Sequence, residues 1–297
     1  MPDKRFVLLV NPRGGTRRGP AILEQVKPVL AAGGAALDVH WTEYSGHARR
    51  IARTLDLAGY DGFCLIGGDG TIQEVAEGLL QRGEPVTTAI GAIPGGTGNT
   101  LLEHLGCSSP MEAARRILAG RTCPLDAVRL TMGTEVVYCV NLIGWGAVAD
   151  INHTAERLRL LGPPRYAVAA LWHILRARRR KARLILDGRA IEDEFTFVIA
   201  CNTRFTGSGM MVAPRAEIDD GKIDVVVLRK VSRWRMFKVL AKVFDGSHVD
   251  LNCIGYYQVR SFAIESEGHE PLDIDGEIKG TAPVSGEMMP GALRVFA

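Results

Sequence analysis

Three glycine-rich segments constrain the fold of this chain more than any other feature. They are Asn-Pro-Arg-Gly-Gly at 11–15, Gly-Gly-Asp-Gly-Thr at 67–71 and Pro-Gly-Gly-Thr-Gly-Asn at 94–99, and each follows an apolar run. In an open α/β sheet such turns lie at the carboxyl ends of the strands, where ligands bind. Glycines expose backbone N–H groups, and the next helix adds its positive end, so three such loops together predict a nucleotide-phosphate site. For a single loop, a tight turn is the better interpretation.

The apolar spacing around these loops predicts alternating strands and helices. Strands are expected at 6–10, 37–42, 62–66 and 88–93, and helices at about 20–32, 46–58, from 72 onward and up to 105. This alternation is typical of a parallel sheet covered on both faces. After residue 124, short strands dominate around one helical stretch at about 155–180. These strands are expected at 125–132, 136–142, 182–186, 195–201, 223–228, 257–265, 272–274 and 293–296.

Length and composition agree with two folded domains. A chain of 297 residues, 46% of them hydrophobic and 23% charged, is neither disordered nor a small scaffold. We predict an α/β nucleotide-binding domain with a parallel sheet over 1–124 and a β-rich, sandwich-like domain over 125–297.

The same numbers exclude several classes of protein. A net charge of +3 is too small for a general nucleic-acid coat. The sequence has no apolar run of about 18 residues and no signal peptide, so no membrane span is expected. Six cysteines without a CxxC pair fit no zinc ribbon and indicate a reducing, cytoplasmic protein. The sequence does not fix the oligomeric state, and a homodimer is one of the states left open.

The glycine loops match neither of the common phosphate-binding motifs. Walker A requires GxxxxGK[ST] and the dinucleotide fold requires GxGxxG, and both are absent. Phosphate binding must therefore use backbone amides and a carboxylate instead of a lysine. Asp69, which lies between two glycines after a strand, is the first candidate for that carboxylate. A helix-capping role is the alternative for Asp69, and we favour a functional one.

These loops resemble the three nucleotide-site motifs of the diacylglycerol kinase catalytic-domain superfamily, which includes sphingosine, ceramide and bacterial lipid kinases. Asp275-Gly276-Glu277 resembles the Asp-Gly-Glu motif near the C-terminus of that family. Order and spacing agree across nearly the whole chain. The resemblance is greatest to sphingosine kinases, on the segments 8–15, 42–43, 47–49, 145–150 and 159–165.

The resemblance implies an ATP- and Mg²⁺-dependent kinase that phosphorylates a primary hydroxyl of a long-chain lipid: a sphingoid base, diacylglycerol or a ceramide-like lipid. It places Asp69 beside the acceptor hydroxyl, and it makes Asp275 and Glu277 a nucleotide and Mg²⁺ pair. Which carboxylate is the general base stays open, and an ordinary Asp-Gly turn is the alternative for the late motif. Carboxylates from two domains would meet across a cleft, and domain closure would exclude water.

The resemblance also assigns a set of nucleotide-binding residues. They are Asn11, Pro12, Arg13, Gly14, Thr42, Gly67, Gly68, Gly70, Thr71, Gly96, Thr97, Gly98, Asn99, Arg159, Arg165 and Gly276. Glu74 fits a capping box begun by Thr71 as well as it fits a place near the substrate. The turn at 219–221 resembles one that holds a structural Mg²⁺ through Asp220 in some bacterial members, and a plain turn is the favoured interpretation.

An apolar helical stretch at 166–175 precedes a run, 176–183, that contains six cations. The stretch at 233–240 has the same character. Alone, such segments are amphipathic helices packed on the core. In a lipid kinase, Val168, Leu171 and Trp172 become a candidate acyl-chain wall and a transient docking face for an anionic membrane, which makes the protein peripheral to the membrane. Arg17 and Arg18 would hold lipid phosphates.

One position departs from the family pattern. Sphingosine kinases usually carry Asp-x-Asp at the substrate headgroup, and this sequence has Asp150-Ile151-Asn152. A carboxylate pairs well with the ammonium group of a sphingoid base, whereas an amide offers neutral hydrogen bonds alone. Neutral ceramide-like or diacylglycerol-like lipids therefore stay open as substrates, unless Asp150 makes the contact with the amine.

The sequence leaves two alternative functions. NAD kinase also carries Gly-Gly-Asp-Gly-Thr but normally shows Asn-Glu after it, and this chain has Gln73-Glu74 as its nearest match. A non-enzymatic module that binds lipid or nucleotide is the second alternative. Intact Asp69, Asp275 and Glu277 argue against such a module.

Overall fold

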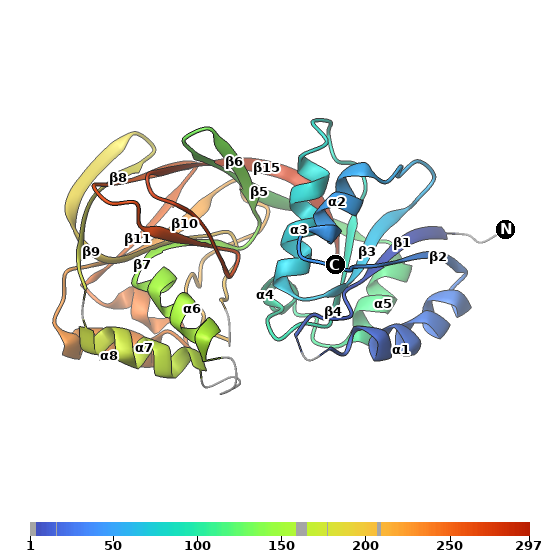
Figure 1. Cartoon of the computed structure of the whole chain (residues 1–297), viewed down its shortest axis with the longest axis horizontal. Helices are drawn as coiled ribbons and strands as arrows, with labels where there is room; N and C mark the ends of the chain where they lie inside the picture. Colours follow the sequence, from blue (N-terminus) through green and yellow to red (C-terminus); the bar gives the residue numbers. More distant parts are fainter. Residues whose placement is uncertain (1–3, 16, 159–164, 177, 207–208) are drawn as a thin grey trace. The chain divides into compact units, whose positions relative to one another are not determined.

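The computed structural model describes residues 4–297 except 16, 159–164, 177 and 207–208. It forms two compact units (Figure 1). The first contains Met1–Ala127 together with Pro290–Ala297, and the second contains Val128–Met289. The sequence placed all of 125–297 in one domain, whereas the last eight residues belong to the first unit. A strand boundary explains the difference, because β15 (Val284–Phe296) continues from the second unit into the first.

The first unit is built on a parallel sheet. Its strands lie in the order β4-β3-β1-β2, and the end of β15 pairs in parallel beside β4, Val295 opposite Ile90. The bounds are β1 Lys4–Val10, β2 Ala35–Trp41, β3 Gly62–Gly67 and β4 Ile90–Pro94. The continuous apolar run of β1 is buried from Phe6 to Val10, as expected of a strand covered on both faces.

Helices cover both faces of this sheet (Figure 1). Phe6, Leu8 and Val10 pack with the apolar residues of α1 (Gly19–Ala32) and α5 (Pro110–Ala119). Val7 and Leu9 point to the other face, where α2 (His47–Thr54) and α3 (Asp69–Leu80) lie against one another. The short α4 spans Thr100–His104.

The sequence analysis did not predict α5, although its start carries a clear signal. Ser109 is the N-cap, Pro110 opens the helix, and the Glu112 amide donates to Ser109 Oγ at 3.2 Å. Glu112 Oε2 in turn accepts from the amide of Ser108 at 3.4 Å. Ser-Pro-x-Glu is therefore a start signal that sequence inspection could have used.

The second unit is dominated by antiparallel strands. They lie in the order β14-β13-β7-β9-β8-β12-β15, with β10 between β9 and β11 and with β6 beside β5. The bounds are β5 Thr122–Met132, β6 Glu135–Cys139, β7 Leu142–Gly146, β8 Arg180–Leu186, β9 Arg189–Cys201, β10 Ile223–Arg229, β11 Ile254–Val259, β12 Ser261–Ser266, β13 Pro271–Ile274 and β14 Glu277–Thr281. Trp145 and Phe195 are fully buried in its core. The predicted fold class is confirmed for both parts of the chain.

Two predicted strands are each divided in the structure. The stretch 136–142 becomes β6 and β7 because the amides at 140–142 turn toward the carboxylate of Asp275. The stretch 257–265 becomes β11 and β12, because the amides of Arg260 and Ser261 both donate to Asp187 Oδ1 at 2.9 Å. In both cases a carboxylate distant in sequence replaces the ladder partner.

Among its described residues, the second unit contains the helices α6 (Ala147–Arg157), α7 (Arg165–Arg176) and α8 (Arg233–Lys242). Helix α7 contacts both α6 and α8. The predicted stretch 155–180 therefore starts too late, because α6 begins at residue 147, and ends too late, because β8 begins at Arg180. None of the helices in the described part of the chain is long and apolar enough to span a bilayer.

Candidate active site

The three glycine-rich loops converge in the first unit. Asn11 Nδ2 donates to Thr71 Oγ1 at 3.0 Å, and the Gly95 amide donates to the carbonyl of Gly67 at 2.8 Å. These bonds join the segments that follow β1, β3 and β4, which are neighbours in the parallel sheet. The structure thus brings together the motifs that the sequence singled out.

Close backbone approach explains why these loops need glycine. A Cβ on Gly96 would lie 2.4 Å from Gly68 Cα. Gly15 has a φ of +52°, and a Cβ there would lie 2.9 Å from the Thr97 amide nitrogen. Side chains at these positions would collide with backbone.

The loops also leave hydrogen-bond donors available. In the part of the chain that the structure describes, the amides of Gly14, Gly15, Thr97 and Gly98 donate to no acceptor. Unpaired amides in glycine-rich turns ahead of α1 and α4 are the donor set that binds phosphate oxygens elsewhere. The residues present therefore fit a nucleotide phosphate.

Asp69 is the first residue of α3 and lies half-buried at this loop surface. Its carboxylate accepts from the Thr100 amide at 2.7 Å and from Thr100 Oγ1 at 2.9 Å. Asp69 therefore caps the start of α4 while its own amide donates to Gly98 at 3.2 Å. Asp69 can cap α4 and still act beside the glycine loops, because a carboxylate has about four acceptor positions and Thr100 occupies two of them.

Glu74 does not form the capping box that the sequence suggested. Helix α3 begins at Asp69, so Thr71 lies inside its first turn and is not the N-cap. Glu74 instead accepts from the amides of Gly46 at 2.8 Å, Ala48 at 3.1 Å and Arg49 at 3.4 Å. It therefore caps α2, a helix about 25 residues earlier in the chain.

The other predicted nucleotide contacts of this unit occupy varied environments. Thr42 follows β2, is buried, and donates its amide to Val10 at 3.0 Å. Arg13 is exposed, with its amide on Asn11 Oδ1 at 3.0 Å. Asn99 Nδ2 donates to the Gly96 carbonyl at 3.2 Å, which closes the 94–99 loop on itself. Arg159 lies outside the described residues.

In the second unit, Asp275 is a buried anchor. Its carboxylate accepts from the amides of Val140, Asn141 and Leu142 at 2.8–2.9 Å and from Cys139 Sγ at 2.9 Å. Burial raises the pKa of Asp275, and these hydrogen bonds act in the opposite direction. Asp275 has a φ of +51° and ties the β13–β14 turn to the β6–β7 connection.

Glu277 lies at the start of β14 with its side chain 45% exposed, and its Oε2 is 2.7 Å from Lys279 Nζ. The two carboxylates of the Asp-Gly-Glu motif therefore differ in environment. One is enclosed by backbone amides, and the other is open to solvent. The Gly276 carbonyl between them accepts from Asn152 Nδ2 at 2.8 Å.

Asp150 belongs to a charge network that sequence inspection missed. Arg180 Nη2 lies 2.7 Å from Asp150 Oδ2, and Arg180 Nε lies 2.8 Å from Glu270 Oε1. The Arg180 side chain is only 9% exposed. Arg180 appeared in the sequence as one cation of a basic run, and Glu270 carries no local signal, since its partner is 90 residues away.

Two atoms of this network, and one atom of Asn152, are buried without hydrogen-bond partners. Within the described residues, Arg180 Nη1, Glu270 Oε2 and Asn152 Oδ1 are buried and make no hydrogen bond. Burial raises the pKa of Glu270, a direction that the Arg180 charge opposes. One donor and two acceptors are therefore available to a polar group of a ligand or to water.

The remaining predicted residues lie on the surface or in a turn. Val168, Leu171 and Trp172 on α7 are 46%, 46% and 51% exposed. Arg165 stacks over the Tyr166 ring at 4.8 Å. Asp220 accepts from the Lys222 amide at 2.9 Å, a contact typical of a turn, and the described residues contain no cluster of three or more metal-ligating side chains.

Comparison with known proteins decides the family. Residues 5–130 match the diacylglycerol kinase catalytic domain, and residues 141–297 match the YegS C-terminal NAD kinase beta sandwich-like domain. The chain belongs to this lipid kinase family. A relative from Chromohalobacter salexigens, described as "Probable lipid kinase YegS-like", is 31% identical over 98% of this chain and 92% of its own length.

Other members extend the family comparison. Sphingosine kinase 1 of Arabidopsis thaliana is 29% identical over 93% of this chain and 68% of its own length. The crystal structure of a diacylglycerol kinase from Bacillus anthracis shares the fold, with a TM-score of 0.83, 24% identity, and coverage of 99% of this chain and 96% of that one. An NAD kinase from Archaeoglobus fulgidus, crystallised with ATP, is 13% identical with a TM-score of 0.54, which shows a related fold alone.

Proposed function

We propose that this kinase transfers the γ-phosphate of ATP, with Mg²⁺, to a primary hydroxyl of a long-chain lipid. The observation that carries the proposal is the set of unpaired amides in the 11–15 and 94–99 loops beside Asp69. Backbone donors of this kind bind phosphate without a lysine. Membership in the lipid kinase family supports ATP as the phosphate donor.

Asp69 takes the general-base role in this proposal. As the lipid oxygen forms its bond to the γ-phosphorus, its proton passes to the Asp69 carboxylate, and the bond to the β-phosphate oxygen breaks to release ADP. The products are a lipid phosphomonoester and ADP. Thr100 holds the Asp69 carboxylate in place through two hydrogen bonds.

The two carboxylates of the Asp-Gly-Glu motif have different roles in this proposal. Mg²⁺, when bound, neutralises charge on the phosphates. Glu277 is the candidate ligand because its carboxylate is exposed, whereas Asp275 acts as a positioning residue that fixes the turn. The Glu277 carboxylate would supply the hard oxygen ligand that Mg²⁺ prefers.

The acceptor is proposed to be a neutral lipid of the diacylglycerol or ceramide type. Asp150 is already paired with Arg180, and Asn152 carries no charge, so the ammonium group of a sphingoid base finds no unpaired carboxylate at these two residues. The orphaned Asn152 Oδ1 fits a hydroxyl or amide donor instead. The exposed apolar residues of α7 support the contact with a lipid surface.

The first experiment measures phosphate transfer from γ-labelled ATP in mixed micelles to diacylglycerol, monoacylglycerol, ceramide and sphingosine, with NAD as a further acceptor. We expect labelled lipid, and a loss of about 10² or more in kcat for Asp69→Asn, because a general base contributes about 10²–10⁴. Asp56→Asn is the matched control, since Asp56 lies in an exposed turn. Label on NAD alone, or full activity of Asp69→Asn, would overturn the proposal.

The acceptor preference is tested separately. Asn152→Asp adds a carboxylate at the Gly276 turn and is expected to raise the sphingosine-to-diacylglycerol rate ratio about tenfold or more, because a charged hydrogen bond contributes about 1.5–3 kcal/mol. Arg180→Gln releases Asp150 and is expected to shift the ratio in the same direction. Thermal melts check that both variants fold. A wild-type enzyme that prefers sphingosine contradicts this assignment while leaving the kinase proposal intact.

A further inference from the structure

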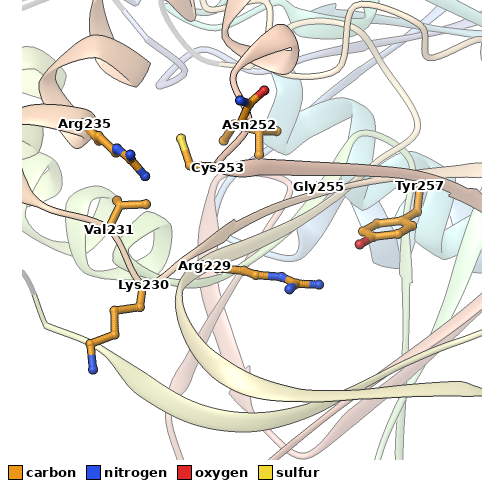
Figure 2. A pocket seen from close by; sticks show the side chains of 9 residues that line it. Arg229, Lys230, Val231, Arg235, Asn252, Cys253, Gly255 and Tyr257 are labelled. Atoms are coloured by element: carbon orange, nitrogen blue, oxygen red, sulfur yellow. The ribbon is translucent and has the colours of Figure 1, made fainter.

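A basic pocket lies in the second unit at the end of β10, the start of α8 and the start of β11 (Figure 2). It has a volume of about 360 Å³, and its charged lining residues are Arg229, Lys230 and Arg235. Asn252 and Tyr257 add polar groups, and no acidic side chain lines it. None of these residues has a role in the proposed phosphate transfer.

The cations of this pocket are incompletely neutralised within the chain. Lys230 Nζ pairs with Glu194 Oε2 at 2.7 Å, whereas Arg229 reaches Asp193 only at 3.6 Å and stays 49% exposed. Within the described residues, the Arg235 guanidinium forms neither a hydrogen bond nor an ion pair. The pocket therefore offers guanidinium groups to an external anion.

The charge of α8 is also one-sided. Its sequence, Arg-Trp-Arg-Met-Phe-Lys-Val-Leu-Ala-Lys, contains four cations and no acid. Arg233 and Arg235 stand in its first turn, where the helix dipole favours acidic side chains. This arrangement costs stability in the isolated protein, and a bound anion would offset it.

A large apolar side chain projects beside the cations. Trp234, between the two arginines, is 80% exposed, while Met236 and Val239 bury the opposite side of the helix in the core. The neighbouring α7 exposes Leu171, Trp172 and Leu175 by about half. Exposed tryptophan with flanking cations is the composition of a helix at an anionic bilayer surface.

We propose that this pocket binds the phosphate group of an anionic phospholipid in a bilayer while Trp234 enters the headgroup region. The phospholipid is a docking ligand and not the lipid that is phosphorylated. Charge complementarity favours this ligand, because a phosphodiester matches the guanidinium groups of Arg229 and Arg235. The adjacent exposed tryptophan favours a bilayer over a soluble anion, because its indole ring partitions into the headgroup region. This inference is independent of the kinase activity.

The test is sedimentation of the full chain with vesicles, in the absence of ATP. One set is pure phosphatidylcholine, and the other contains added phosphatidylglycerol, an anionic phosphodiester lipid. We expect wild-type binding to require the anionic lipid and to fall about 30-fold in Arg229→Gln/Arg235→Gln, given the attraction of each cation to an anionic surface. Arg115→Gln/Arg189→Gln removes the same charge from exposed positions elsewhere and is expected to bind nearly as wild type. Equal loss in both double variants, or none in either, overturns the proposal.

Two further measurements separate the bilayer from a soluble anion. The fluorescence of Trp234 is obtained as the difference between the spectra of wild type and Trp234→Phe. Its emission maximum is expected to shift to the blue when anionic vesicles are added and to stay unchanged with phosphatidylcholine vesicles. Inorganic phosphate or glycerol phosphate at millimolar concentration is expected neither to shift it nor to release the vesicles. Binding of these soluble anions with displacement of vesicles would assign the pocket to a free phosphate compound and refute the docking role. Thermal melts confirm that every variant is folded.

Discussion

Asp275 is a motif residue whose side chain binds backbone amides of another segment, 140–142. Its carboxylate satisfies three consecutive amides that have left the strand ladder between β6 and β7. A side chain without acceptors at this position would leave those amides buried and unpaired. The Asp-Gly-Glu turn would then be held beside β7 by the β13 pairing and by the Asn152 contact to Gly276, without the Asp275 carboxylate.

We therefore predict that Asp275→Ala lowers the free energy of unfolding by about 3 kcal/mol or more, since each orphaned buried donor costs about 1–3 kcal/mol. Urea unfolding monitored by tryptophan fluorescence provides the measurement. Asp219→Asn, at an exposed turn, serves as the control and is expected to stay within about 0.5 kcal/mol of wild type. A loss below about 1 kcal/mol for Asp275→Ala would mean that these bonds are replaced by water.

For single residues, the sequence indicates which positions matter better than it indicates what their side chains contact. The need for glycine at Gly15 and Gly96 is visible locally, because several glycines in one turn have few other causes. The partners of Glu74 and Asp275 are 25 to 136 residues away, and no local pattern encodes them. The sequence predicts Asp150 to be a headgroup residue, and its pairing with Arg180 is visible only in the folded chain.

Among the elements, α2 depends on a carboxylate from α3. Its N-cap is Gly46, which has no side chain to accept the first amides, and Glu74 supplies the acceptor. Helix α2 has no acidic residue of its own in the first turn. Glu74 therefore both caps α2 and adds to its contact with α3, which also includes the ion pair between Arg49 and Glu77.

Glu74→Ala is expected to cost about 1–2 kcal/mol of stability, the usual value of a helix cap, and to speed hydrogen exchange at the amides of Ala48 and Arg49. Glu74→Gln keeps one acceptor oxygen and should recover much of the loss. Hydrogen exchange read by mass spectrometry checks both variants. If Glu74 touches the lipid acceptor instead, Glu74→Gln will raise KM without changing the exchange of α2.

Elements with a sustained apolar period were predicted correctly, and α1 and α3 are examples, since Ile22, Val26 and Leu30 repeat on one buried face. The misses have tertiary causes. Strands 136–142 and 257–265 are broken by Asp275 and Asp187, whose carboxylates compete with ladder bonds. Helix α5 is the exception, because its capping signal at Ser109 is local and the sequence prediction did not include it.

For the molecule as a whole, the half-buried His173 and the buried His248 couple stability to pH. Burial lowers the pKa of His173, whose Nε2 lies 2.8 Å from Thr154 Oγ1, and burial also lowers the pKa of His248. In the unfolded chain both titrate near 6.5. As the pH falls below that value, the unfolded state takes up protons first, so the free energy of unfolding decreases.

We expect stability to fall between pH 7 and pH 5 and His173→Gln to make that decrease less steep. Urea unfolding at pH 7, 6 and 5 provides the comparison. The buried Asp224 and the partly buried Glu270 have pKa values raised by burial and act with the opposite sign. Comparing the variant with wild type at each pH removes their contribution. An unchanged slope in His173→Gln would show that this histidine titrates normally.

The path of β15 has a consequence for synthesis of the chain. Residues 290–297 complete the first unit: Val295 pairs with Ile90, the Phe296 ring meets that of Phe6 at 6.0 Å, and the Gly291 amide donates to Asp126 at 2.6 Å. During translation the strand β4 emerges about 200 residues before its neighbour. Until residues 290–297 are synthesised, one side of β4 is an unpaired sheet edge. We expect nascent chains at this stage to need chaperone protection of that edge.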